Sequence, residues 1–536
     1  MPKPAEKEIA REVLYVSGMA SGENGSDSIN VMAADAETAT PGKIDQLQSV
    51  AGNLDSKGVD NAVFQYTPFS EAEIGEVAKN PLTLDDCIRI TLSKNIALRL
   101  AKSELTKAEV THSGSYGKFL PTFTLQGGQE NTMQKRPFNA LAPADPTRLN
   151  FNNNFLVGEM QQVLPTGMVL SFVGDLRRDL NSPDQFGAPP TRTENLAYTV
   201  SLTQPLLRGA WATVARSSIN LAQYDRQMQE KQLSSTKLAT IYSVKRAYYN
   251  VLLQRELIKV NQAAIRQDST LVKASQSMVQ AKVATRRDVL SAQIRLADDR
   301  TELIRTQTEY QLALDALKEV IGLPIEMPIE LTEAKLSFSP LALDEDALIK
   351  LAVENSPSTH SAEIAVDRAR LAFKVARNSL LPLLDLTVLH SGRLDTDRDL
   401  RKDLWTTGLQ ASINLSYPFL NREAAANAEN AQIAVSQQQD RLVDLQRQIV
   451  LGVRSIIRSA HSTAEELNAL QGTIAAAEEK VEFATAMFRL GRASNLDIID
   501  AQEALFKAQN QYLSKLVDYH TQLALLESLT GQPLTQ

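Results

Sequence analysis

Hydrophobic and polar residues alternate along four short segments of the chain. The alternation runs without a break through Leu409–Tyr417 and Leu196–Thr203, and shorter versions occupy 121–126 and 384–388. A period of two gives a β-strand one apolar face and one polar face. A further strand-like stretch runs over 157–173, where Leu164-Pro-Thr-Gly167 fits a hairpin turn. The pattern predicts four strands, or six if this stretch is a hairpin, and leaves open whether the hairpin joins the other strands.

Two-faced strands of this kind fit two settings. One is a half-buried sheet over a soluble core, and the other is a membrane sheet with lipid on one face and water on the other. A strand of about ten residues crosses a bilayer when tilted. A closed membrane barrel needs about eight strands, and an open strand edge cannot lie in lipid. If the strands span a membrane, several copies of the chain must therefore share one barrel.

Most of the remaining chain is predicted to be helical. There is no Gly or Pro from Ala210 to Ile321 and no Pro from Phe419 to Gln532, and both spans are rich in strong helix formers. Long helices are predicted over about 210–281 and 422–490, each roughly 105 Å long at 1.5 Å per residue. Helices of this length need partner helices along their whole extent. Shorter helices are predicted over 84–119, 287–321, 343–380 and 496–530.

The chain contains two copies of one unit. Val283–Gln293 matches Arg492–Gln502 at an offset of 209 residues, and the match continues without a gap to Gly322 and Gly531. In each copy, two short helices laid end to end match the length of one long helix. The predicted organisation is a flexible N-terminal extension over 1–80, a first repeat over 82–324, an equatorial linker over 325–342 and a second repeat over 341–536.

Composition and motifs exclude several classes of function for this chain. The 536 residues carry a formal charge of −7 with mixed signs, which argues against a nucleic-acid partner. No run of about 18 apolar residues provides a transmembrane helix, and the first 80 residues lack the apolar segment of a secretory signal peptide. The single cysteine, Cys87, excludes an intramolecular disulfide framework, and no pair of the five histidines has metal-site spacing. We expect no cofactor, no metal site and no enzymatic activity, because phosphate loops and nucleophile elbows are missing as well.

These features together resemble the TolC family of outer-membrane efflux and secretion ducts. The resemblance covers about 82–533. It is carried by the duplicated helix starts with Asn95 and Asn355, the Leu-Pro pairs ending at 121 and 382, Gln204-Pro-Leu-Leu207, and the segment Phe488–Ala501. It implies a mainly α-helical fold with an internal two-fold repeat. Three chains would form an α-helical barrel of long coiled-coil hairpins, continuous with a short outer-membrane β-barrel.

The resemblance also implies a function and partners. The chain would be the passive trans-periplasmic exit duct of a tripartite efflux pump or a type I secretion system. It would form a homotrimer in outer-membrane lipid with its helical tunnel in the periplasm. At the tunnel tip it would meet a periplasmic adaptor (membrane fusion) protein and an inner-membrane transporter. The alternative is a non-membrane helical scaffold with a soluble β-sheet end, which the missing signal peptide favours and the alternating strands and duplicated tips oppose.

The resemblance assigns roles at the tip. Asp497 and Asp500 would line the pore constriction, Asp288, Phe488 and Arg492 would belong to the gate and the tip helix starts, and Gly491, Ser494 and Thr285 would receive the adaptor.

Local chemistry gives two of these acids a second role. Ser494-x-x-Asp497 and Thr285-x-x-Asp288 are also capping-box patterns. The family's tip arginine is replaced here by Ala493, with Arg492 beside it. The first copy has Lys282 in place of the tip glycine and Ser291 in place of the second acid, so we expect the two tips to differ.

Overall fold

A computed structural model describes residues 80–135, 148–183, 191–282, 284–332, 336–397, 402–490 and 492–534. The extension predicted over 1–80 lies outside these ranges except for Asn80. The chain divides into Met1–Asn61 and Ala62–Gln536, and every element described below belongs to the second unit.

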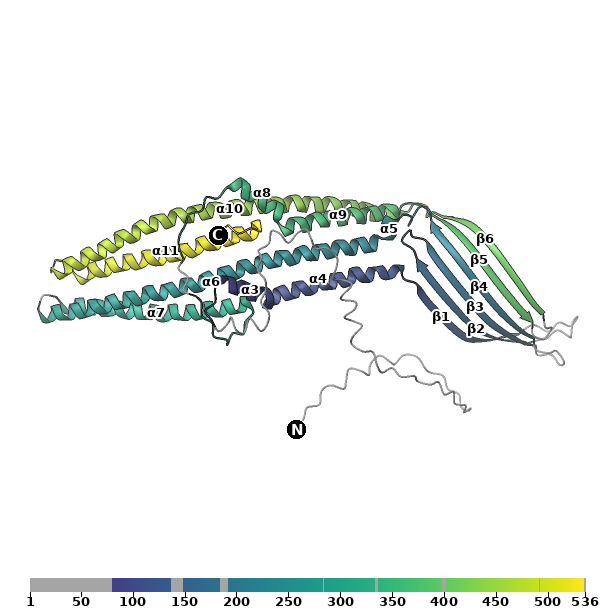
Figure 1. Cartoon of the computed structure of the whole chain (residues 1–536), viewed down its shortest axis with the longest axis horizontal. Helices are drawn as coiled ribbons and strands as arrows, with labels where there is room; N and C mark the ends of the chain where they lie inside the picture. The colour runs from purple at the N-terminus through teal and green to yellow at the C-terminus, as the bar shows by residue number, and fades with distance from the viewer. Residues whose placement is uncertain are drawn as a thin grey trace, which may run out of the picture. The chain divides into compact units, whose positions relative to one another are not determined.

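Six strands form one antiparallel sheet in which every strand pairs with its neighbour in sequence (Figure 1). The strands predicted from alternation are all present, and each is longer than its alternating run. The 157–173 stretch is a hairpin, as predicted, and it joins the same sheet. The strands are β1 (Thr122–Lys135), β2 (Arg148–Val163), β3 (Val169–Pro183), β4 (Thr191–Pro205), β5 (Leu383–Asp397) and β6 (Lys402–Ser416).

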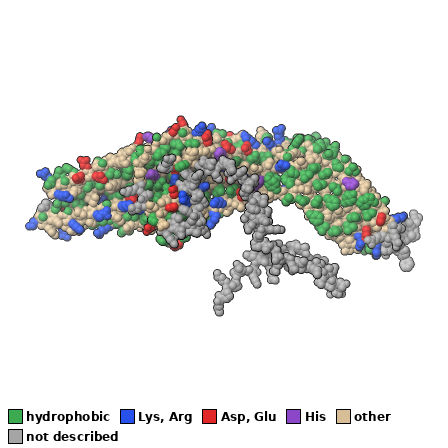
Figure 2. Space-filling model, viewed as in Figure 1, with side chains coloured by type: hydrophobic (Ala, Val, Ile, Leu, Met, Phe, Trp, Pro, Cys, Tyr) green, Lys and Arg blue, Asp and Glu red, His purple; other side chains and the backbone are tan. Residues whose placement is uncertain are grey.

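The helix-proximal part of the sheet has one apolar face across all six strands, because the strand register aligns the apolar positions there. The pair Leu202–Val388 links β4 to β5, and Leu386–Ile413 links β5 to β6. Leu202, Leu386 and Ile413 are exposed in the single chain, with Ile413 at 69%, and Figure 2 shows hydrophobic side chains gathered over the strands. The opposite face is more polar, with Thr203 opposite Thr387 across the β4–β5 pair, and it also carries Phe155 and Val157 of β2.

The helices form two similar groups. In the first, α6 (Ser217–Gln280) packs against α4 (Ile96–Ser115) and α7 (Arg286–Ile321); in the second, α10 (Arg422–Arg489) packs against α9 (Pro357–Asn378) and α11 (Asn495–Thr530). At 1.5 Å per residue the two long helices span about 96 and 102 Å. The shorter elements are α3 (Leu84–Lys94), α5 (Ala212–Ala215), α8 (Glu345–Asn355) and the 3-10 turn η2 (Tyr116–Phe119).

Two of the predicted short helices are each broken into two, so the prediction of single helices over 84–119 and 343–380 is wrong. The breaks lie at Asn95 and Ser356, whose backbones are extended and whose side-chain oxygens accept hydrogen bonds from the first turn of the next helix. The amide nitrogens of Asn95 and Asn355 donate to the Val320 and Thr530 carbonyls, at 2.8 and 3.2 Å. Asn95 and Asn355, which carried part of the family resemblance, therefore hold equivalent helix ends in both groups.

A buried ion pair joins the two groups halfway along their length. Lys245 on α6 lies 2.5 Å from Glu527 on α11, and their side chains are 9% and 4% exposed. The other oxygen of Glu527 accepts the Leu534 backbone N–H at 3.0 Å. Desolvated charges of this kind are stable only when paired and hydrogen-bonded, so this contact fixes how α6 and α11 lie against each other.

Candidate functional site

The candidate site is the end of the helical groups farthest along the chain from the sheet, where α6 turns into α7 and α10 turns into α11 (Figure 1). Both second helices start with a capping box. The Asp288 carboxylate accepts hydrogen bonds from the Thr285 backbone N–H and hydroxyl at 2.9 and 2.7 Å. Asp497 accepts the same pair from Ser494 at 2.7 and 2.9 Å. These hydrogen bonds, from the hydroxyl first at Asp288 and from the backbone first at Asp497, lower the pKa of both carboxyls and keep them ionised.

Asp500 lies one turn farther along α11 and has a cationic partner. Lys480 on α10 donates to its carboxylate at 2.5 Å, and both side chains are largely exposed. Asp497 and Asp500 are exposed on the same side of α11, while Ile498 between them is buried. The acidic pair thus consists of one carboxylate tied to its own helix start and one paired with a lysine.

The two tips are tied to each other by Asn495, which is fully buried. Its amide nitrogen donates to the Ser275 hydroxyl on α6 at 2.5 Å and to the Asp288 backbone carbonyl on α7 at 2.9 Å. One side chain therefore bridges from the first residue of α11 to both helices of the other hairpin. Thr285–Asp288 and Ser494–Asp497, far apart in the sequence, lie next to each other for this reason.

Apolar packing reinforces this contact. Phe488, only 6% exposed, packs in a cluster to which α6, α7, α10 and α11 all contribute, together with Leu271, Ala292 and Ile498. Full burial of such side chains stabilises by about 1.5–3 kcal/mol each. In the single chain Phe488 therefore contributes to the core between the hairpins.

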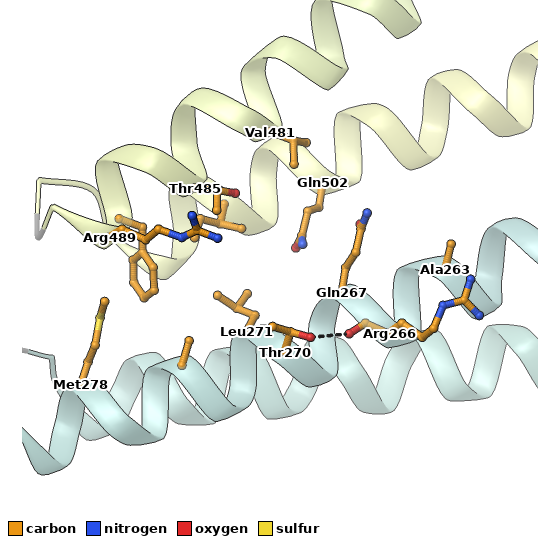
Figure 3. A pocket seen from close by; sticks show the side chains of 13 residues that line it. Ala263, Arg266, Gln267, Thr270, Leu271, Met278, Val481, Thr485, Arg489 and Gln502 are labelled. Carbon is orange, nitrogen blue, oxygen red and sulfur yellow. Dashed lines mark hydrogen bonds between the residues drawn. The ribbon is translucent and has the colours of Figure 1, made fainter.

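A groove of about 580 Å³ runs between α6 and the α10–α11 tip. Figure 3 shows Gln267, Leu271 and Met278 projecting from α6 toward the α10–α11 hairpin, with Gln267 pointing toward Gln502. The Thr270 hydroxyl donates to the Arg266 carbonyl at 2.9 Å and so stays on its own helix. The groove is mostly apolar, with Arg266 and Arg489 as its charged residues.

Beside the groove lies a buried acidic pair. Asp268 on α6 and Asp299 on α7 are 2% and 6% exposed. The Arg295 Nε lies 3.7 and 3.4 Å from their carboxylates, and the Arg295 Nη1 lies 3.7 Å from Glu503 on α11. Burial, and then hydrogen bonding and repulsion by Asp299, raise the pKa of Asp268 to about 7, while Arg295 opposes the rise. Arg295 connects three helices, and Asp268 changes its charge near neutral pH.

The other predicted tip residues have varied surroundings. Gly491 lies outside the described residues. Arg492 is exposed, and no ion pair joins its guanidinium to a residue within the described ranges. Lys282, which replaces a tip glycine, adopts a left-handed backbone with φ of 60°. Thr285 and Ser494 are exposed, but their hydroxyls already serve the capping boxes.

Several residues of the tip were not found from the sequence: Asn495, Lys480 and the Asp268–Asp299–Arg295 cluster. Asn495 stands inside the motif that carried the family resemblance, so the signal was present, but nothing in one sequence shows that its amide is buried. Asp268 and Asp299 look like any carboxylate on a long helix. Their burial depends on helices of the other hairpin, which helical periodicity alone does not specify.

Two general findings concern the described part of the chain. None of its helices is both long and apolar enough to cross a bilayer. In the same ranges, no three His, Cys, Asp or Glu side chains gather as metal ligands would.

Comparison with known proteins identifies the family. The profile of the family described as "Outer membrane efflux protein" matches residues 170–323 and 348–532. The alkaline protease secretion protein AprF of Pseudomonas aeruginosa is 25% identical over 343 residues, which cover 63% of this chain and 70% of that protein. The outer membrane protein TolC of Vibrio cholerae is 22% identical over 366 residues, which cover 66% of this chain and 80% of TolC.

Solved structures agree with the fold. The structure of the outer membrane protein VceC from Vibrio cholerae superimposes with a TM-score of 0.62 at 15% identity, covering 84% of this chain and 97% of that one. The predicted fold of long helical hairpins with a small β part is confirmed, and the alternative of a non-membrane scaffold is wrong. The protein is a non-enzymatic channel of the outer membrane with a periplasmic helical extension. The chain belongs to the outer membrane efflux protein family, the TolC-like channels that serve tripartite efflux pumps and type I secretion systems.

Proposed function

We propose that three copies of the chain form one passive exit duct, with a shared barrel in outer-membrane lipid and a shared helical tunnel in the periplasm. The observation that carries this proposal is the sheet. Its apolar face runs in register across six strands, and its two outer strands, β1 and β6, are exposed along their whole length. Unpaired backbone groups at such edges cannot lie in lipid. Pairing β6 of one copy with β1 of the next removes every edge.

The dimensions of the sheet support a membrane location. On β5 the apolar face runs from Leu384 to Leu394 with one polar side chain, His390, within it, and this is ten residue steps or about 34 Å along the strand. A strand tilt of about 40° turns this length into a band roughly 26 Å tall, close to the apolar band of outer-membrane barrels. The polar face then lines a water-filled lumen. In this proposal the duct is passive, so transport is driven by a partner.

At the other end, the tip is proposed to meet the periplasmic adaptor protein and, through it or beside it, the inner-membrane transporter. The apolar groove between α6 and the α10–α11 tip is the proposed docking surface, because an apolar groove between helices can receive the apolar face of a partner helix. Thr285, Ser494 and Gly491 are the residues proposed to receive the adaptor. Asp497 and Asp500 of three copies form the proposed acidic ring at the entrance, and such a ring favours cations. Phe488, Asp288 and Arg492 hold the gate region in place.

Engineered disulfides test the shared barrel. One cysteine replaces an inward residue of β1, Thr124→Cys, and the second replaces an inward residue of β6, in a series of Gln410→Cys, Ser412→Cys and Asn414→Cys. We expect at least one combination to give covalent trimers after oxidation. The control is Ser171→Cys with Ser201→Cys, which stand opposite each other on β3 and β4 of one chain and should cross-link without changing the apparent mass. Monomers throughout the series, in a protein that stays dissolved without detergent, would refute the proposal.

A further inference from the structure

The two halves of the chain supply different numbers of strands. Between α9 and α10 there is one hairpin, β5–β6, whereas between η2 and α5 there are four strands. The additional pair is β2–β3, joined by the tight turn at Leu164–Met168. Gly167 in this turn has φ of 88°, and a Cβ there would lie 2.7 Å from the Gly209 carbonyl oxygen. The turn is therefore packed against the junction between β4 and the helices.

The β2–β3 hairpin is an integral part of the sheet. β2 pairs with β1 from Thr122–Gln161 to Lys135–Arg148, and β3 pairs with β4 from Val169–Thr203 to Asn181–Thr191. A hairpin that served as a plug in the lumen would leave β1 and β4 to pair with each other. Here β1 and β4 are separated by both additional strands.

In its helix-proximal part, the hairpin has the same apolar outer face as its neighbours, whereas farther along β2 the faces differ, with Asn152 and Asn154 on the outer face and Phe155 on the inner one. Phe172 lies between Met160 on β2 and Val200 on β4, and all three belong to the apolar face. One residue away, Ser171 lies between Gln161 and Ser201 on the polar face. The apolar residues of β2 and β3 are also exposed in the single chain, with Phe172 at 42% and Leu176 at 48%. Outward apolar side chains at this height are what a lipid-facing strand requires.

From these observations we propose that β2–β3 is a barrel-widening hairpin, so that the shared barrel has eighteen strands and a lumen for bulky solutes. The inference rests on the trimer proposed above, since three copies of six strands make eighteen. The number is even within each copy, so β6 of one copy runs antiparallel to β1 of the next. Without the additional hairpin, three copies would supply twelve strands.

The difference in width follows from strand geometry. Strands about 4.8 Å apart and tilted by about 40° give a backbone diameter of roughly 36 Å for eighteen strands and roughly 24 Å for twelve. Side chains occupy about 5 Å at each wall, which leaves lumens of roughly 26 and 14 Å. A helix with its side chains is about 10 Å across, so the wider lumen passes a helical hairpin and the narrower one passes a single helix. The solute class inferred for this barrel is therefore one with folded secondary structure, such as a helical polypeptide.

Cysteine labelling in intact outer membranes tests the placement of the hairpin. The native Cys87 is fully buried, and Cys87→Ala provides a background without it. We expect Ser171→Cys on β3 to react with a small charged maleimide and Phe172→Cys to be protected by lipid, with Ser201→Cys and Leu202→Cys as the matched pair on β4. If both β3 positions react while the β4 pair behaves as expected, the hairpin lies in water outside the wall. That result would overturn this inference and leave the trimeric duct intact.

A deletion tests the width. Removing 148–183 joins Thr147 to Asp184 and gives the first half the same single-hairpin plan as β5–β6. A polymer-linked maleimide about 20 Å across, between the two lumen widths, should label Ser201→Cys in the full chain and fail to label it in the deletion variant, while the small maleimide labels both. Direct counting of strands in images of the purified full-length particle covers the case in which the deletion variant does not fold. Twelve strands in a trimer would refute the widening alone, whereas a particle that is not a trimer would refute the proposed function.

Discussion

Asp268 gives the helical tip a pH dependence that can be measured. Its carboxylate is 2% exposed and faces Asp299, with Arg295 as the nearby cation and Glu503 on the far side of that arginine. The pKa of Asp268 is raised to about 7, so the folded protein holds a proton that an unfolded chain releases near pH 4. The substitution Asp268→Asn keeps the shape of the side chain and removes this proton.

The sign and size of the effect follow from the raised pKa. The stabilising contribution of protonated Asp268 is fully present below its unfolded pKa and is lost as the pH rises through about 7. The interval from 3.8 to about 7 corresponds to at most about 4 kcal/mol per copy, at 1.36 kcal/mol for each tenfold change in proton affinity. The wild type should lose stability between pH 4 and pH 8, and Asp268→Asn should lose much less. At pH 8 the variant should be the more stable protein.

Two measurements check this prediction. Infrared difference spectra should show a protonated carboxyl band that disappears between about pH 6 and pH 8 in the wild type and is missing in Asp268→Asn. Unfolding midpoints across the same pH range, in one detergent, report the stability. Asp298→Asn is the matched control, because Asp298 is exposed and adjacent to Asp299 on the same helix. Equal pH profiles for the wild type and Asp268→Asn would show that Asp268 is ionised throughout and that the argument from burial is wrong.

Three further predictions concern the tip and the middle of the helices. Asn495→Ala removes the hydrogen bonds to Ser275 and the Asp288 carbonyl and should weaken the contact between the hairpins by about 1–3 kcal/mol; amide exchange should accelerate around 485–500 and stay unchanged in the sheet. Lys245→Met leaves Glu527 buried with its ion-pair partner removed and should cost about 3–5 kcal/mol, while Lys245→Met with Glu527→Leu should recover most of the loss in the unfolding midpoint. Asp497→Asn with Asp500→Asn should reduce cation preference or raise conductance in planar bilayers, because it removes the proposed acidic ring; Asp518→Asn, exposed farther along α11, is the control, and unchanged selectivity in the double variant would remove the ring from the proposal.

The sheet could be predicted because its signal is local. Alternation in Leu196–Thr203 and Leu409–Tyr417 depends only on a period of two, and both stretches lie within strands. The Pro-Thr-Gly turn identified the β2–β3 hairpin. Its membership of the sheet could not be predicted, because pairing with β1 and β4 is decided by contacts with residues outside the hairpin.

The lengths of the long helices could be predicted from the sequence, but the breaks in the short helices and the burial of Asp268 were not predicted. Their lengths followed from the lack of Gly and Pro and from the capping boxes at Thr285 and Ser494. The breaks at Asn95 and Ser356 were missed, although Pro357 directly after Ser356 is a local sign of a helix start. Asn95 has no such neighbour, and its amide finds a partner only because the Val320 carbonyl lies nearby. Asp268 was missed because a charged residue on a helix is usually solvated. Its burial here depends on packing between two hairpins.

The two halves of the chain agree where they support the fold and differ at the tip and in the number of strands. Both second helices end at a left-handed glycine, Gly322 or Gly531, and both use an asparagine to hold that end. At the tip, Asp500 with its lysine corresponds to Ser291, and the bridging Asn495 corresponds to Arg286. At the other end, one half has an additional hairpin. In the proposed trimer the two kinds of tip would alternate, and a partner docking there would meet two chemically different surfaces. Repeats that served only to build a tube would have no need to differ at its two ends.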